Sequence, residues 1–115
     1  MSKYGNKEKI IDNIVFQSNL EAKRYRQLSL LEKAKEIKDL KLQVKFELQP
    51  KFIKNGKTIQ AINYIADFVY YDNKLNKTIV EDTKGFKTDT FKIKKKMFEY
   101  KYRDLELKEI RKEDI

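Results

Sequence analysis

Two strand-like runs separated by a short turn constrain this fold more than any other feature of the sequence. The runs Ile65–Tyr71 and Thr78–Gly85 are rich in β-branched and aromatic residues, and the segment between them, Asp72–Lys77, has turn composition. Together they predict an antiparallel hairpin.

This hairpin brings two acidic residues together. If its turn is centred between Lys74 and Leu75, Asp67 lies opposite Asp82, because the two positions are symmetric about that centre. Residues two apart on a strand share a face, so Lys84 projects beside Asp82. Two carboxylates directly opposite one another destabilise a sheet, which favours a divalent cation between them.

The residue types available limit how such a cation is held. The chain has no cysteine and no histidine, which excludes a disulfide framework, a thiolate metal site and an imidazole base. Oxygen ligands favour Mg²⁺ or Mn²⁺ over zinc. We therefore expect magnesium, or manganese, as the cofactor.

Length and charge limit the possible partners. With 115 residues, the chain fits one domain, and 27 basic against 18 acidic residues leave a net charge of +9. Such a charge indicates a polyanionic partner, either nucleic acid or an anionic membrane. The sequence contains neither a bilayer-spanning apolar run nor the apolar segment of a signal peptide, so we expect a cytoplasmic protein.

The remaining pattern predicts a helix, three strands, a helix and a final strand. We expect an arm and lead-in strand over 1–17, a single domain over 18–110 and a frayed tail over 111–115. The first predicted elements are an edge strand or an extended lead-in over Ile10–Phe16, a helix capped by Ser18 that runs to about Asp39, and a strand over Leu42–Ile53 interrupted at Gln49-Pro50. An Asn55-Gly56 turn then leads into a long strand over Thr58–Tyr71, which is followed by the strand ending at Gly85. The last predicted elements are a helix capped by Thr88 or Asp89 that runs through Tyr102, and a strand from Leu105 to Ile110 parallel to the Asp82 strand or a neighbour.

The spacing of the acidic residues resembles a known motif. Asp67, followed about fifteen residues later by Asp82-Thr83-Lys84, is similar to the motif of the PD-(D/E)XK nuclease superfamily, with Ala66 where the motif's name has a proline. The predicted element order is likewise similar to the αβββαβ core of that superfamily. The resemblance implies an α/β (α+β) fold of the restriction-endonuclease-like type, with a central mixed sheet flanked by helices.

Within this superfamily, the chain more closely resembles a small phage-encoded family. That family has segments like Phe16–Ala22, Leu48–Phe52 and Tyr64–Tyr71. The superfamily implies that Asp67 and Asp82 hold the cation, with the carbonyl of Thr83 as a further ligand. Lys84 would orient the attacking water and stabilise the developing oxyanion.

Two further polar residues each have two interpretations. Glu21 either caps its helix only, as the third helical residue of a Ser18 capping box, or points its carboxylate at the acidic pair to bind metal or water, as a first-helix glutamate often does in the superfamily. Gln49 either stabilises a bulge beside Pro50 or reaches the active site, as comparable glutamines do in some related nucleases. We include both among the candidate catalytic residues.

A cluster of basic residues follows the acidic site in the sequence. Between residues 84 and 103 there are eight basic and two acidic residues, which indicates phosphate contact, although a solvated helix surface would have the same composition. The candidate DNA-binding residues are Lys87, Lys92, Lys94, Lys95, Lys96, Lys101 and Arg24.

The leading hypothesis is a magnesium-dependent DNA endonuclease that hydrolyses phosphodiester bonds. Compact members of the superfamily include Holliday-junction resolvases, so we expect a homodimer that cuts branched DNA during phage recombination or replication. One alternative is a duplex endonuclease or nickase that serves as a subunit of a larger assembly. Another is a non-catalytic nucleic-acid-binding module, which would not need Asp67, Asp82 and Lys84 together.

Overall fold

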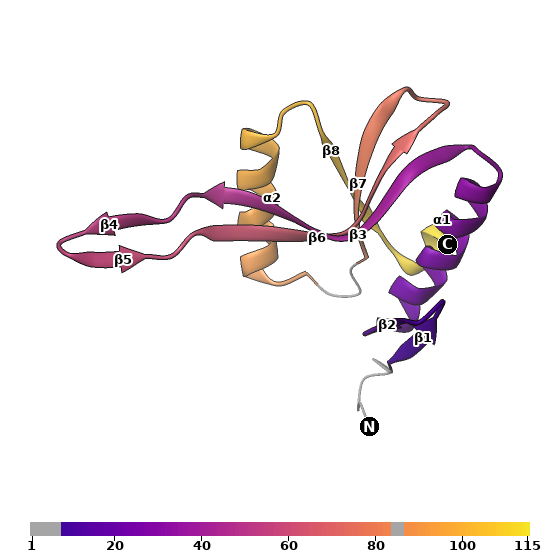
Figure 1. Ribbon diagram of the computed structural model, residues 1–115, viewed down its shortest axis with the longest axis horizontal. Coiled ribbons are helices and arrows are strands. Elements are labelled where there is room, and N and C mark those ends of the chain that lie inside the picture. Colours follow the sequence, from indigo (N-terminus) through magenta and orange to yellow (C-terminus); the bar gives the residue numbers. More distant parts are fainter. Residues whose placement is uncertain (1–7, 84–86) are drawn as a thin grey trace.

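The structure is a computed structural model that describes residues 8–83 and 87–115, and Figure 1 shows the arrangement of its elements. The described residues form helices and strands with these bounds: β1 Lys9–Ile11, β2 Ile14–Phe16, α1 Asn19–Lys33, β3 Ile37–Gln49, β4 Phe52–Lys54, β5 Lys57–Ile59, β6 Ile62–Asp72, β7 Lys77–Thr83, α2 Asp89–Lys101, β8 Glu106–Ile110 and the short 3₁₀ helix η1 Lys112–Asp114. No helix within the described ranges is long and apolar enough to cross a membrane.

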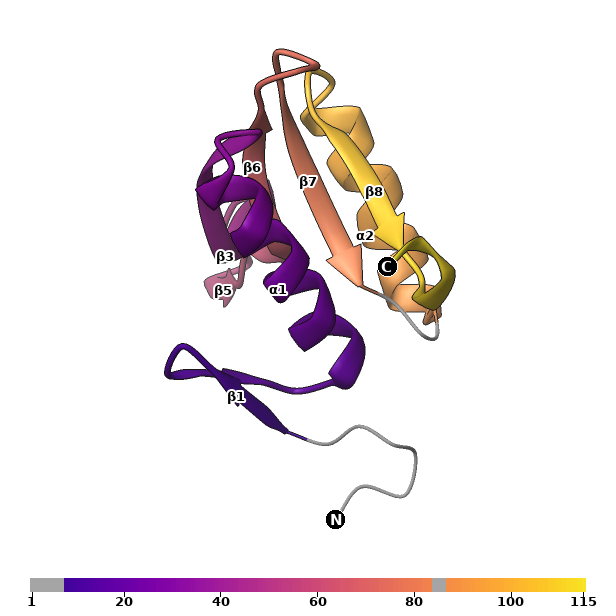
Figure 2. The same ribbon diagram turned by 90° about the vertical axis from the view of Figure 1, so that its right-hand side faces the viewer.

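A four-stranded mixed sheet forms the centre of the fold. Its strand order is β3-β6-β7-β8, with antiparallel pairs β3–β6 and β6–β7 and a parallel pair β7–β8. Figure 2 shows α1 and α2 on opposite faces of this sheet. The observed order α1, β3, β6, β7, α2, β8 therefore confirms the predicted α+β class and its αβββαβ order.

Successive residues of β7 separate the two halves of the core. Ile79 packs in the cluster that contains the α1 residues Tyr25 and Leu28, whereas Val80 packs in the cluster that contains Phe98 of α2. Alternation along the strand directs these neighbours to opposite faces. By the same alternation, Glu81 faces the α1 side and Asp82 faces the α2 side.

The first helix begins where predicted and ends earlier. The Ser18 side chain accepts a hydrogen bond from the backbone N–H of Glu21 at 3.1 Å, which is the predicted N-cap contact. The helix ends at Lys33 rather than near Asp39, so that part of the prediction was wrong. Lys35 has a φ of 62°, which breaks the helical path before β3 begins at Ile37.

The N-terminal segment is a hairpin, and not the single edge strand or extended lead-in that we expected over Ile10–Phe16. Strands β1 and β2 pair in antiparallel fashion around Asp12 and Asn13, whose φ angles are 53° and 64°. Positive φ at both central residues is typical of a type I′ turn. The Tyr25 hydroxyl donates to Asp12 Oδ2 at 2.9 Å, which ties the hairpin to α1. The predicted arm before it lies mostly outside the described residues.

The Asn55-Gly56 turn is present, but the strands beside it form a separate ribbon. The two residues have φ angles of 52° and 74°, and they connect β4 to β5. The predicted continuous strand over Thr58–Tyr71 is interrupted, because β6 begins only at Ile62. Figure 1 shows the β4–β5 ribbon projecting away from the body of the protein.

The later elements follow the sequence prediction closely. In the β6–β7 ladder, Phe68 pairs with Glu81, which is the register that places position 67 next to position 82. Thr88 caps α2 by accepting from the backbone N–H of Phe91 at 3.0 Å. The tail differs from the expected frayed end, because residues 112–114 form η1.

Candidate active site

Asp67 lies at the point where β6 leaves its ladder with β7. The last pair at that end of the ladder is Phe68 with Glu81. Beyond it, the backbone N–H and the hydroxyl of Thr83 both donate to Asp67 Oδ2, each at 2.8 Å. These two bonds fix the orientation of the Asp67 carboxylate.

Asp82 contributes the second acidic side chain. It is 1% exposed, and its carboxyl group interacts with that of Asp67. The phenol of Tyr64 lies beside Asp82, and burial together with the Asp82 charge raises the pKa of Tyr64. The structure thus brings Asp67 and Asp82 together at the open end of the β6–β7 hairpin, away from its turn.

Glu21 contributes the third acidic side chain, from the first turn of α1. It is 8% exposed, and its carboxylate accepts a hydrogen bond from Gln43 Nε2 at 2.9 Å and interacts with Asp67. It also accepts from the backbone of Gln17. The side chain is therefore directed at Asp67, while the Ser18 half of the capping box is formed separately.

The three carboxyl groups strongly perturb one another. Burial, followed by the charge of Asp67, raises the pKa of Glu21 to about 7. Burial opposes ionisation of Asp67 as well, but hydrogen bonds from Asp82, Thr83 and Glu21 lower the pKa of Asp67 below its usual value. The site consequently favours an ionised Asp67 and disfavours the charged form of Glu21.

Gln43 completes the cluster, and sequence reasoning missed it. Its Nε2 donates to Glu21 at 2.9 Å and makes a longer contact of 3.4 Å with Asp67 Oδ1. Strand alternation assigns Gln43 to the solvent face with Lys45, so the sequence contains no signal for this role. In the β3–β6 ladder, Leu42 pairs with Phe68 and Val44 with Ala66, so Gln43 lies across from Asp67.

Gln49 does not join the cluster. It is the last residue of β3 and pairs with Ile62, five residues before Asp67 on β6. Five strand residues span roughly 17 Å. The structure therefore favours the local interpretation of Gln49 and corrects its assignment to the catalytic group.

Arg24, which we predicted to contact DNA, instead forms an ion pair within the protein. Its Nε and Nη2 donate to the two carboxylate oxygens of Glu81, at 2.7 and 2.6 Å, and its Nη1 donates to Gln27 at 2.8 Å. The hydroxyl of Tyr70 also donates to Glu81, which is fully buried. This bidentate pair joins α1 to β7 and leaves Arg24 committed within the protein.

Some of the other predicted DNA-binding residues contact other parts of the protein, and the rest lie on the surface of α2. Lys87 and Lys95 both form ion pairs with Glu109, which lies opposite Asp82 in the parallel ladder. Lys101 donates to the backbone carbonyl of Glu47 at 2.8 Å. The remaining lysines are exposed or half-buried on α2, and they are Lys92, Lys94 and Lys96. Lys84 lies outside the described residues.

A cavity of about 430 Å³ opens beside the acidic cluster. Glu21, Gln43 and Asp67 line one part of it, and Val15 and Phe16 of β2 line another. The N-terminal hairpin thus forms a wall of the cavity. A reacting group seated there would lie against the carboxylates of Glu21 and Asp67.

The acidic residues offer an oxygen-only donor set, the type that Mg²⁺ and Mn²⁺ prefer. Within residues 8–83 and 87–115, no three acidic side chains are already close enough together to enclose a metal ion. Asp67 instead interacts with Asp82 on one side and Glu21 on the other. The chemistry of this donor set, oxygen atoms alone, suits a hard divalent cation.

Comparison with known proteins assigns the chain to a family. The model of a family described as "Protein of unknown function (DUF1064)" matches residues 1–114, so the chain belongs to this family. No curated protein and no solved structure has significant similarity to the chain.

Proposed function

We propose that this member of the DUF1064 family is a metal-dependent DNA endonuclease of the PD-(D/E)XK type, selective for branched DNA. One observation carries the proposal: Asp67 of β6 interacts both with Asp82 of β7 and with Glu21 of α1, in a chain whose net charge is +9. Clustered buried carboxylates destabilise a fold, so a small basic domain has no structural reason to assemble them.

Asp67, Asp82, Glu21 and the carbonyl of Thr83 are the groups that would hold Mg²⁺ or Mn²⁺. Such a cation, when bound, lowers the pKa of a water ligand and neutralises phosphate charge. The protein's own contribution is to fix the donors. Thr83 orients Asp67 through two hydrogen bonds, and Gln43 holds Glu21 against the cavity.

The role of Lys84 is inferred from the motif alone, because Lys84 lies outside the described residues. It follows Asp82 by two residues, and we expect its amine to orient the attacking water and stabilise the developing oxyanion. The reaction is hydrolysis of a phosphodiester: the water oxygen forms a bond to phosphorus, the bond from phosphorus to the leaving oxygen breaks, and the proton lost by the water balances the proton gained by the leaving oxygen.

The substrate follows from size and charge. A domain of this size has little room for a base-reading module, which favours recognition of backbone charge and DNA shape. A homodimer of such domains would place paired nicks on a two-fold-symmetric four-way junction. We therefore place the Holliday junction first among the candidate substrates, and linear duplex second.

A cleavage assay tests this proposal. Labelled four-way junction, flap and linear duplex are incubated with the protein, with Mg²⁺ or with EDTA, and binding is measured separately. We expect metal-dependent cutting that is fastest on the junction, and loss of cutting in Asp82→Ala and Lys84→Ala with DNA affinity largely retained. Asp104→Ala, at an exposed loop position, is the matched control and should cut normally.

The possible negative results have different meanings. Undiminished cleavage by both variants would eliminate the site assignment. Binding without cleavage of any DNA would favour the non-catalytic binding module instead. Equal rates on junction and duplex would favour the duplex endonuclease or nickase.

A further inference from the structure

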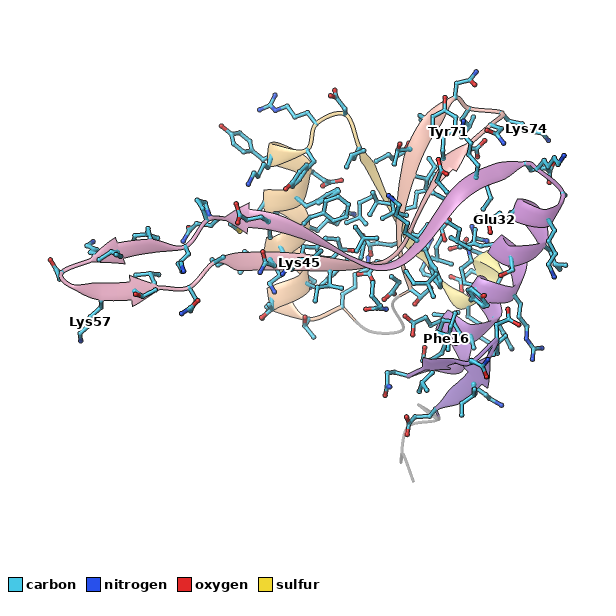
Figure 3. The ribbon with its side chains drawn as sticks, viewed as in Figure 1. Phe16, Glu32, Lys45, Lys57, Tyr71 and Lys74 are labelled. Carbon is cyan, nitrogen blue, oxygen red and sulfur yellow. The ribbon has the colours of Figure 1, made fainter. Side chains whose placement is uncertain are left out.

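The β4–β5 ribbon is an exposed projection that the proposed catalytic site does not use. Every residue from 50 to 60 is exposed, including Ile53 at 74%. Figure 3 shows Lys57 on this ribbon, far from Phe16 at the cavity wall. An isolated two-stranded ribbon is only marginally stable in water, so this one is expected to gain order from a partner.

The charge of the ribbon identifies the kind of partner. Residues 50–61 include three lysines and no acidic residue. Lys54 and Lys57 form a directly opposed cross-strand pair, an arrangement that is unfavourable until an anion neutralises it. A second copy of this chain also has a net charge of +9, which opposes its approach, whereas a phosphate backbone is uniformly anionic.

The shape of the ribbon fits duplex DNA. The major groove is about 12 Å wide and admits a two-stranded β-ribbon. From Gly56 at the turn to Asp67 at the acidic cluster there are eleven strand positions, at most about 36 Å. That span is about one turn of B-DNA, so a duplex cut at the acidic cluster could reach the turn of the ribbon about ten base pairs away.

We propose that the β4–β5 ribbon is a DNA-clamping arm that contacts the phosphates of a duplex about one helical turn from the scissile bond, through Lys51, Lys54 and Lys57. This inference rests on the proposed function and specifies how that site holds its substrate. Lys54 and Lys57 share one face of the ribbon, opposite to Ile53, because adjacent strand residues alternate between faces, and Lys51 precedes β4 at the base of the ribbon.

The test compares two triple variants with the same change in charge. The arm variant is Lys51→Gln, Lys54→Gln and Lys57→Gln. The control variant is Lys33→Gln, Lys38→Gln and Lys74→Gln, at exposed positions near the opposite end of the protein. Duplex affinity is measured by fluorescence anisotropy from about 50 to 200 mM salt, and thermal melts verify that both variants fold.

We expect the arm variant to lower the slope of log affinity against log salt by two to three, and the control variant to change it by less than one. The effect should occur with duplexes of about 25 base pairs and disappear below about 10 base pairs, which do not reach the arm. Cleavage of long substrates should weaken through KM, with kcat retained.

Other results would overturn the arm assignment. Equal slopes for the arm and control variants, while the wild type binds and cuts DNA, would reject the arm and leave the proposed function intact. An arm variant with an unchanged slope but a lower molecular mass in solution would assign the ribbon to contact between copies. A wild-type protein with no DNA affinity would reject the proposed function together with the arm.

Discussion

Thr83 binds Asp67 through two hydrogen bonds, one from its backbone N–H and one from its hydroxyl, both to Oδ2 at 2.8 Å. The contact joins the end of β7 to β6 where their ladder stops, and it places one of the two proposed metal-binding acids. A residue next to Asp82 in the sequence therefore controls the geometry of the acid on the neighbouring strand.

The first prediction removes only the hydroxyl of Thr83. In Thr83→Val the side chain keeps its shape and the backbone N–H still donates, so the fold is expected to remain. A hydrogen bond to a charged group contributes about 1.5–3 kcal/mol, so cleavage should fall roughly tenfold or more. Because that bond helps to lower the pKa of Asp67, the pKa should rise in an NMR titration. Thr83→Ser retains the hydroxyl and should restore both values.

The second prediction compares the contributions of two β3 glutamines to the cleavage rate. Gln43 contacts Glu21 and Asp67, whereas Gln49 lies roughly 17 Å along the sheet. Gln43→Ala should slow cleavage about fivefold, because Glu21 loses the amide that orients it, and Gln49→Ala should stay within about twofold of wild type. Steady-state cleavage rates at matched metal concentration decide the comparison. A larger loss from Gln49→Ala would contradict the structural placement.

The symmetry of the β6–β7 hairpin explains why the sequence could predict that Asp67 and Asp82 lie close together. The turn between β6 and β7 fixes the register, so the positions of Asp67 and Asp82 follow from counting residues. Helix caps at Ser18 and Thr88 were equally local signals, and both are observed. These features depend on neighbouring residues, which is why sequence alone determines them.

The features that the sequence did not predict depend on contacts between residues that are distant in the chain. Gln43 reaches the cluster because the pairing of β3 with β6 places it across from Asp67, a register between distant segments that the local sequence pattern does not reveal. Arg24 was assigned to DNA on the basis of charge, and only the packing of α1 on β7 reveals Glu81 as its partner. The end of α1 near Lys33 depends on where β3 can begin pairing with β6, which is a tertiary constraint.

The third prediction follows from the Arg24–Glu81 pair. Arg24→Met keeps much of the side-chain volume but leaves Glu81 buried without its guanidinium, a change that typically costs about 3–5 kcal/mol. We expect a marked loss of unfolding free energy in urea. Arg26→Met, on the exposed side of the same helix, is the control and should change stability by less than about 0.5 kcal/mol. A stable Arg24→Met protein with weakened DNA binding would restore Arg24 as a DNA contact.

The fourth prediction concerns the pH dependence of the metal-free protein. Burial and the charge of Asp67 raise the pKa of Glu21 from 4.5 to about 7, so the folded state binds the Glu21 proton more tightly than the unfolded chain does. This contribution to stability is fully present below pH 4.5 and is lost as the pH rises through about 7. The lowered pKa of Asp67 acts in the opposite direction, but below pH 3.8, so the two effects occupy separate windows.

Urea denaturation in EDTA at about pH 5 and about pH 8 measures this effect. The full shift corresponds to on the order of 3 kcal/mol, and we expect the wild type to lose part of that amount between the two values. Glu21→Gln removes the titrating proton but retains a polar side chain of similar size, so its stability should be nearly constant over the same range. An equal pH dependence in the two proteins would show that another group titrates. Since a cation would favour the ionised carboxylates, added Mg²⁺ should flatten the wild-type profile and leave that of Glu21→Gln little changed.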